Sequence, residues 1–172
     1  MKSVRSLLAA AMLLPAIAGA QTLNGGWTAF TWSGAATQLG VRSFSITSAN
    51  PFSVQLTDAG RVGDQFRLNW TGAANGNAFT SVFGGTDGFQ TNCASGPLCF
   101  ADANLSKGTF LFAASGSAYN FTIDVVRSAQ PFATEATFTG YAQVSTVPEP
   151  ATWALMGTGL LAIFGVAKRR RA

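Results

Sequence analysis

The stretch "YNFTIDVV" (residues 119–126) decides the fold, because apolar and polar residues alternate along most of its length. Alternation with period two is typical of a strand that buries one face. The stretch "SFSITS" (residues 43–48) has the same pattern. Five further stretches behave similarly: "FSVQLT", "DQFRLNWT", "NAFTSVF", "GTFLFAA" and "TFTGYAQV". They predict an all-β domain.

Turn signals separate these stretches, among them Asn50-Pro51, Asn75-Gly76 and Asp87-Gly88. Seven or eight short strands at this spacing, in about 127 residues, favour an antiparallel two-sheet sandwich of jelly-roll-like type. No helical period is visible between residues 21 and 147, and no internal repeat suggests a propeller or a solenoid. We therefore expect a single β-sandwich domain over residues 21–146.

The segment "MKSVRSLLAAAMLLPAIAGA" (residues 1–20) predicts a signal peptide. Two basic residues precede a short apolar core, and Ala18 and Ala20 form the small-x-small pattern that signal peptidase accepts. Cleavage after Ala20 would make Gln21 the first residue of the mature chain. The alternative, a transmembrane anchor, is disfavoured because the apolar core is short and a proline interrupts it. We expect export across the inner membrane.

The segment "VPEPATWALMGTGLLAIFGVAKRRRA" (residues 147–172) has the features of a membrane anchor. Residues 151–167 carry no charge, and as a helix they would be about 26 Å long, which is at the short end of what spans a hydrocarbon core. Basic residues beside such a span stay on the cytoplasmic side, so the domain before it should lie across the membrane. The alternative, a buried core helix, would bring four adjacent cations close to apolar surface. These cations are Lys168, Arg169, Arg170 and Arg171.

Pro148 and Pro150 disfavour a helix around Glu149, so this triplet should be extended and exposed outside the bilayer. The triplet, the apolar stretch and the basic cluster together resemble the PEP-CTERM sorting signal of Gram-negative bacteria. The resemblance implies that an exosortase recognises and processes the chain. It also implies a membrane-anchored precursor that passes to the cell envelope or the extracellular space. Its family association is with exopolysaccharide and biofilm, so exopolysaccharide is a candidate partner.

The charges of the chain do not favour a nucleic-acid partner. The sequence has 11 basic and 7 acidic residues and a pI near 9.6, but six of the basic residues lie in the two terminal segments. Between residues 21 and 147, five basic residues stand against six acidic ones. Binding to nucleic acid needs a basic face on the folded domain, and this composition does not provide one.

Cys93 and Cys99, in "TNCASGPLCFAD", predict a disulfide that pins a Gly-Pro loop between strands, because an exported chain folds in an oxidising compartment. A zinc site is the alternative, but zinc generally takes four ligands and the chain has no histidine. We expect neither a metal nor a cofactor.

The lack of histidine also excludes Ser-His-Asp and Cys-His catalysis. A glycosidase-like carboxylate pair remains conceivable. Asp58 and Asp64 flank the turn "AGRVG", and Asp87 and Asp102 bracket the cysteine loop. Aspartates in such turns commonly bond their own backbone or face water, so we expect no catalytic residue and no enzyme. Calcium bound by loop carboxylates remains an alternative.

Three tryptophans, Trp27, Trp32 and Trp70, are candidate glycan-binding residues, because exposed indole rings can stack on sugars. The alternative is core packing, which we expect for at least two of them. Taken together, the sequence predicts an exported, exosortase-processed cell-surface or extracellular-matrix protein that is non-catalytic and associated with exopolysaccharide or biofilm. A carbohydrate- or calcium-binding β-sandwich module is the alternative.

Overall fold

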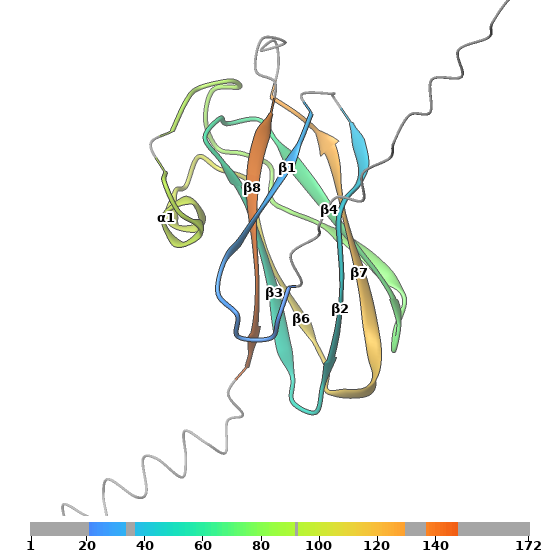
Figure 1. Ribbon diagram of the computed structural model, residues 1–172. Coiled ribbons are helices and arrows are strands. Elements are labelled where there is room, and N and C mark those ends of the chain that lie inside the picture. The colour runs from blue at the N-terminus through green and yellow to red at the C-terminus, as the bar shows by residue number, and fades with distance from the viewer. Residues whose placement is uncertain (1–20, 34–36, 92, 130–136, 148–172) are drawn as a thin grey trace, which may run out of the picture.

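The computed structural model describes residues 21–33, 37–91, 93–129 and 137–147, which form a β-sandwich with one short helix (Figure 1). The predicted signal peptide and the predicted membrane helix with its basic cluster lie outside these residues. No helix within the described residues is long and apolar enough to cross a membrane. The elements are β1 Thr28–Trp32, β2 Gln38–Ser48, β3 Phe52–Ala59, β4 Gln65–Gly72, β5 Gly76–Phe79, α1 Gly96–Ala101, β6 Lys107–Phe112, β7 Ser115–Arg127 and β8 Phe138–Thr146.

The strands form two four-stranded sheets, with the orders β1-β8-β3-β6 and β2-β7-β4-β5. Every pairing between the named strands is antiparallel. The pairs β4–β5, β3–β6, β2–β7 and β1–β8 are nested inside one another along the chain, as they are in a jelly roll. The predicted all-β, antiparallel two-sheet sandwich is therefore confirmed.

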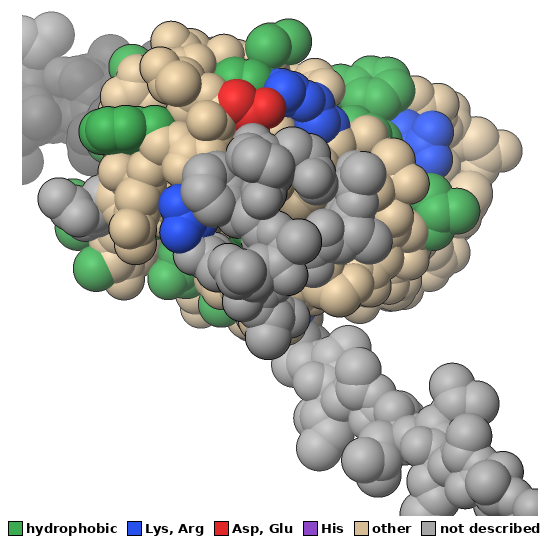
Figure 2. All heavy atoms as spheres, turned by 90° about the horizontal axis from the view of Figure 1, so that it is seen from above, with side chains coloured by type: hydrophobic (Ala, Val, Ile, Leu, Met, Phe, Trp, Pro, Cys, Tyr) green, Lys and Arg blue, Asp and Glu red, His purple; other side chains and the backbone are tan. Residues whose placement is uncertain are grey.

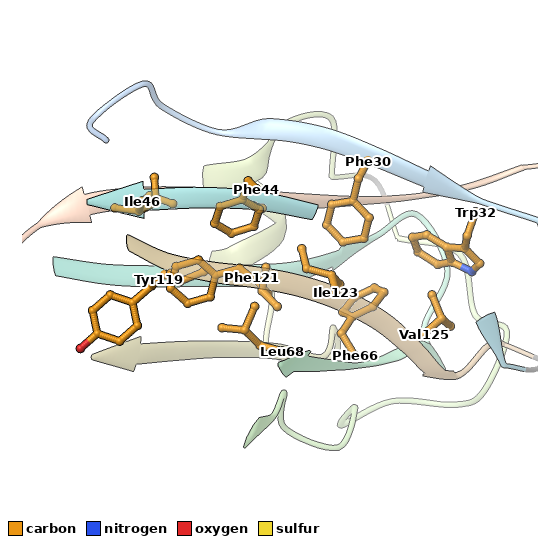
Figure 3. Packing of buried hydrophobic residues seen from close by; sticks show 14 of the residues in the cluster. Phe30, Trp32, Phe44, Ile46, Phe66, Leu68, Tyr119, Phe121, Ile123 and Val125 are labelled. Carbon is orange, nitrogen blue, oxygen red and sulfur yellow. The ribbon is translucent and has the colours of Figure 1, made fainter. Parts of the chain in front are cut away.

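The core lies between the two sheets and consists mainly of the apolar residues that alternate along the strands. In β7, Tyr119, Phe121, Ile123 and Val125 point inward, and the polar residues between them lie on the outer face. Figure 3 shows these side chains meeting aromatic residues of β1, β2 and β4. Ring pairs such as Phe44 on Phe121, with centroids 5.0 Å apart, fill the interior. Burial of these rings provides the main stabilisation of the fold.

Three elements differ from the sequence-based expectation, and the first is strand β1, which lies outside the predicted stretches. The stretch "NAFTSVF" forms a strand only up to Phe79, the end of β5. The Gly-Pro stretch between the cysteines forms helix α1, where we expected a loop and no helix. Pro97 lies in the first turn of α1, where a proline needs no hydrogen-bond partner for its nitrogen. A helix of six residues is too short to show a 3.6-residue period.

Candidate functional site

The sorting-signal residues Pro148, Glu149, Pro150 and Lys168 to Arg171 lie outside the described residues, as do Ala18 and Ala20 of the predicted cleavage site. The residues on the domain side of each terminal segment, Gln21 and Val147, are part of the described structure. Gln21, the first described residue, is buried, and its side-chain amide donates to Gly26 O at 3.4 Å. At the other end, Val147 N donates to Pro51 O at 2.9 Å. The hydrogen bonds of the sandwich therefore extend to the residue before the Pro-Glu-Pro triplet.

The three tryptophans have different environments. Trp32 is only 2% exposed, its ring lies edge-on to Phe66, and its Nε1 donates to Ser128 Oγ at 3.3 Å. Trp70 is partly buried and packs edge-on against Phe112. Trp27 is half-buried beside α1, with its ring centroid 5.4 Å from that of Phe100. The ring of Trp32 offers no face to a sugar, which corrects its place among the candidate glycan-binding residues.

The predicted disulfide is present and joins Cys93 to Cys99, with the Cα atoms 5.0 Å apart. Cys99 is fully buried and belongs to a second apolar cluster with Val62 and Leu105. The disulfide thus holds α1 against the end of the sandwich where β3 turns into β4. Tyr141 of β8 packs against the same cluster.

A pocket of about 290 Å³ opens beside the disulfide at this end of the sandwich. It lies between the start of the β3–β4 turn, the disulfide loop and the first residues of β8. Its polar lining offers a guanidinium, an amide, a phenol and hydroxyl groups. The lining residues are Ala59, Gly60, Arg61, Gln90, Cys93, Thr137, Phe138, Thr139 and Tyr141. Such a mixture of two aromatic residues, Phe138 and Tyr141, and several hydrogen-bonding groups is suited to a small polar ligand.

Asp58 and Asp64 lie at the two ends of the β3–β4 turn, and both are 0% exposed. Asp58 Oδ1 accepts the N–H of Ala59 at 2.6 Å, so this aspartate does bond its own backbone. Asp64 Oδ1 accepts from Ser128 Oγ at 2.9 Å and from the N–H of Ala129 at 2.7 Å. Complete burial closes both carboxyl groups to a substrate, so they are unsuited to a glycosidase-like role.

The other two turn aspartates have separate structural partners. Asp87 forms an ion pair with Arg127, with 2.5 Å between its Oδ2 and the guanidinium Nη2. Asp102 Oδ1 accepts the N–H of Asn104 at 2.9 Å, just after α1. Viewed from this end of the sandwich, acidic and basic side chains lie together in a surface that is otherwise mostly uncharged (Figure 2). Within the described part of the chain, no three Asp, Glu, Cys or His residues are grouped so that they could hold a metal ion.

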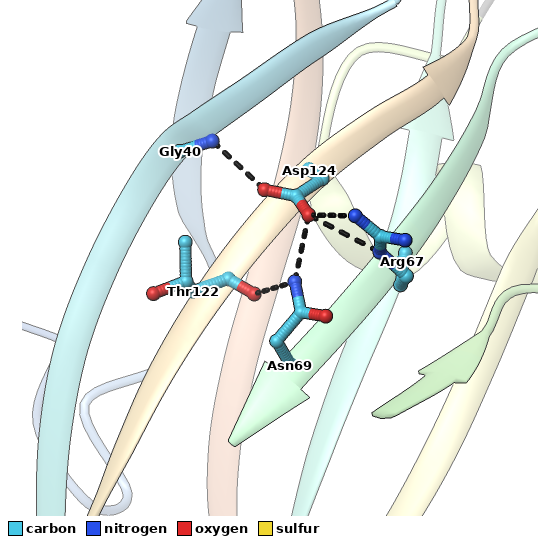
Figure 4. Close-up of polar contacts among 5 residues, drawn as sticks. All are labelled: Gly40, Arg67, Asn69, Thr122 and Asp124. Carbon is cyan, nitrogen blue, oxygen red and sulfur yellow. Dashed lines mark hydrogen bonds and ion pairs between the residues drawn. The ribbon is translucent and has the colours of Figure 1, made fainter. Parts of the chain in front are cut away.

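A polar cluster that the sequence did not reveal lies on the outer face of the second sheet (Figure 4). Asp124 of β7 accepts from Gly40 N–H at 2.8 Å, from Arg67 Nη2 at 2.7 Å and from Asn69 Nδ2 at 2.7 Å. Burial by itself would raise the pKa of Asp124, but these donors and the charge of Arg67 outweigh it and lower the pKa below its usual range. The cluster ties β2, β7 and β4 together.

The comparisons with known proteins identify the end of the chain. The model of a family described as the PEP-CTERM protein-sorting motif matches residues 146–171. The chain carries a PEP-CTERM sorting motif. The motif begins at Thr146, the last residue of β8. A PEP-CTERM motif implies export, a membrane-anchored precursor and processing by an exosortase.

Similarity over the folded domain is much weaker. One similar solved structure is the pre-peptidase C-terminal domain of collagenase from Bacillus anthracis, which is 13% identical in sequence. The match covers 68% of this chain and 87% of that one, with a TM-score of 0.31. No curated protein is significantly similar to the chain.

Proposed function

We propose that this PEP-CTERM protein is a non-catalytic cell-surface or extracellular-matrix protein that is associated with exopolysaccharide or biofilm. The observation that carries the proposal is the sorting motif at residues 146–171, which begins at the last residue of β8. The chain has no histidine, and its buried carboxyl groups Asp58 and Asp64 are closed to substrates. Both features support a structural or binding role over a catalytic one.

The proposal predicts that the Pro-Glu-Pro triplet controls the final form and location of the protein. Replacing Pro148, Glu149 and Pro150 with alanine should leave the tail on the protein and keep it in the membrane fraction. The measurement is intact mass together with fractionation of the native host into membrane, envelope and medium. Thr71→Ala, at an exposed position of β4, is the control for export and folding. An unchanged mature mass and distribution in the triple variant would remove the sorting role.

A second candidate function is carbohydrate binding by the sandwich itself, and the pocket beside the disulfide favours it. Arg61, Gln90 and Tyr141 give that pocket hydrogen-bonding groups and an aromatic ring, which are the features that sugar sites use. Calcium, the other ligand of this alternative, has less support, because the described residues hold no group of three acidic side chains that could bind it.

The carbohydrate alternative predicts that Gln90→Ala weakens retention of the protein on the exopolysaccharide of its host. Gln90 is exposed, so the substitution should change the melting temperature little. Thr71→Ala again serves as the control, because it lies on the other sheet and away from the pocket. Equal retention of both variants and the wild type would leave this pocket without a role in glycan binding.

A further inference from the structure

The β3–β4 turn contains two acidic groups in a site from which water is excluded. Asp58 is the next-to-last residue of β3, and Asp64 directly precedes β4; neither is exposed to solvent. A buried carboxylate is costly unless its charge is balanced or its oxygens are hydrogen-bonded. Two such groups in one turn therefore need an explanation from their contacts.

The hydrogen bonds account for only one oxygen of each group. Asp58 Oδ1 accepts from the N–H of Ala59, and Asp64 Oδ1 accepts from Ser128 and from the N–H of Ala129. As carboxylates, both would leave Oδ2 buried without a hydrogen-bond partner. The charge and the hydrogen bonding of Asp64 both act on Asp58, so the two carboxyl groups are neighbours. One proton placed between them satisfies both orphaned oxygens and removes one of two buried negative charges.

We propose that Asp58 and Asp64 form a one-proton carboxyl pair, in which Asp58 donates to Asp64, and that this pair fastens the β3–β4 turn to the segment after β7. The proton belongs on Asp58, because two donors from Ser128 and Ala129 already stabilise the charge of Asp64. Burial, with the charge and hydrogen bond of Asp64 added, raises the pKa of Asp58 well above its usual range and outweighs the backbone N–H donors of Ala59 and Asp64, which lower it. Burial also raises the pKa of Asp64, but its hydrogen-bond donors oppose that effect.

No charged residue described near the pair forms an ion pair with it that would favour loss of the proton. Asp87 faces Asp64 from the loop that follows β5, and its negative charge also raises the pKa of Asp64. Asp87 is in turn paired with Arg127 of β7. Arg61, inside the turn, donates to the backbone carbonyl of residue 88. Lys107, on β6 beside β3, donates its Nζ hydrogens to two carbonyls at the end of α1. Each of these three cations thus has a partner other than the carboxyl pair.

The pair is part of a chain of hydrogen bonds that crosses the sandwich. Trp32 of β1 donates to Ser128, Ser128 donates to Asp64, and the shared proton continues the chain to Asp58 of β3. Loss of the proton would place a second charge in this site and break the last bond of the chain. The β3–β4 turn and the pocket that begins at Ala59 would then loosen together. The stability of this end of the domain therefore depends on pH through the protonation of the pair.

The pH dependence of unfolding tests the proposal. Between the ordinary Asp pKa of about 3.9 and the raised pKa of Asp58, the folded chain holds one proton more than the unfolded chain, so stability falls as the pH rises. Asp58→Asn keeps the shape and donates an amide N–H in place of the proton. The ratio of the unfolding constants, wild type over Asp58→Asn, should rise about tenfold per pH unit in this window. Asp102→Asn, which keeps its bond to Asn104, is the matched control and should follow the wild type.

A second measurement reads the proton directly and does not depend on stability. The ¹³C signal of the Asp58 carboxyl, recorded on the exported protein purified from its host, should stay at the protonated position well above pH 3.9. In Asp64→Asn the amide would donate to Asp58, and the Asp58 carboxyl should then titrate at lower pH. Parallel unfolding curves for the wild type and Asp58→Asn, or an Asp58 signal that titrates near 3.9, would overturn the proposal. So would stabilisation by Ca²⁺ that Asp58→Asn abolishes, because a cation would then occupy the place of the proton.

Discussion

Trp32 offers the sharpest test of how the core carries the stability of the domain. Its ring stacks on Phe138 with centroids 5.9 Å apart and lies edge-on to Phe66 at 5.2 Å. Its Nε1 also donates to Ser128. Replacing a buried aromatic ring with alanine costs about 3 to 5 kcal/mol, because the cavity collapses only in part. At roughly 4 °C per kcal/mol for a domain of this size, Trp32→Ala should lower the melting temperature by about 12 to 20 °C.

Two further variants separate the contribution of the hydrogen bond of Trp32 from that of its buried ring. Trp32→Phe keeps a ring but removes the N–H donor, so it should cost about 1 to 2 kcal/mol. Trp27→Ala removes a half-buried ring that packs against Phe100, and it should cost about 1 to 2 kcal/mol. Thermal and urea unfolding monitored by circular dichroism provide the measurements. A melting temperature of Trp32→Ala within a few degrees of the wild type would refute the reasoning, as would loss of exopolysaccharide retention in a Trp32→Ala protein that remains stable.

The remaining predictions concern the disulfide, two glycines and the outer-face cluster. The native protein should have no titratable thiol at Cys93 or Cys99. Replacing both cysteines with serine should lower the free energy of unfolding by about 2 kcal/mol, because the closed loop is short. Two free thiols in the folded protein would contradict the disulfide. Both Gly60 and Gly63 have positive φ, but only at Gly63 would an added Cβ collide with neighbouring atoms. In urea unfolding, Gly63→Ala should therefore cost about 3 kcal/mol and Gly60→Ala about 1 kcal/mol. Equal costs for the two variants would refute the predicted collision. Asp124→Asn should lower the free energy of unfolding by about 1 to 2 kcal/mol at neutral pH. Because the pKa of Asp124 is lowered in the folded protein, its contribution to stability is complete above the ordinary Asp pKa and is lost as the pH falls through the folded pKa. A cost that does not change with pH would count against the ion pair.

The strands could be predicted from the sequence because each one buries a single face. Residues 119–126 show this best, since every second side chain enters the core of the sandwich. The first strand, Thr28–Trp32, lies outside the predicted stretches, because five residues give little periodicity. Its position beside β8 depends on a partner more than a hundred residues away, which a local pattern does not encode.

The acidic pair shows what local sequence could not provide. The turn "AGRVG" correctly predicts a tight connection between two strands, with Gly60 and Gly63 in conformations that favour glycine. It gives no sign that Asp58 and Asp64 are buried, because the covering groups come from distant parts of the chain. Ser128 and Ala129, for example, follow β7, more than sixty residues later. The sorting motif, by contrast, could be recognised from sequence because its parts are contiguous.

The position of β8 has a consequence for the order in which the chain folds. This last strand lies inside its sheet, hydrogen-bonded to β1 on one side and to β3 on the other. Until residues 138–146 emerge, β1 has no neighbour in the sheet and β3 is paired only with β6. A chain that is threaded N-terminus first through a narrow channel would therefore keep this sheet incomplete until almost all of the domain has passed. The topology therefore makes completion of this sheet depend on its last strand, and the sorting motif begins at Thr146, the last residue of that strand.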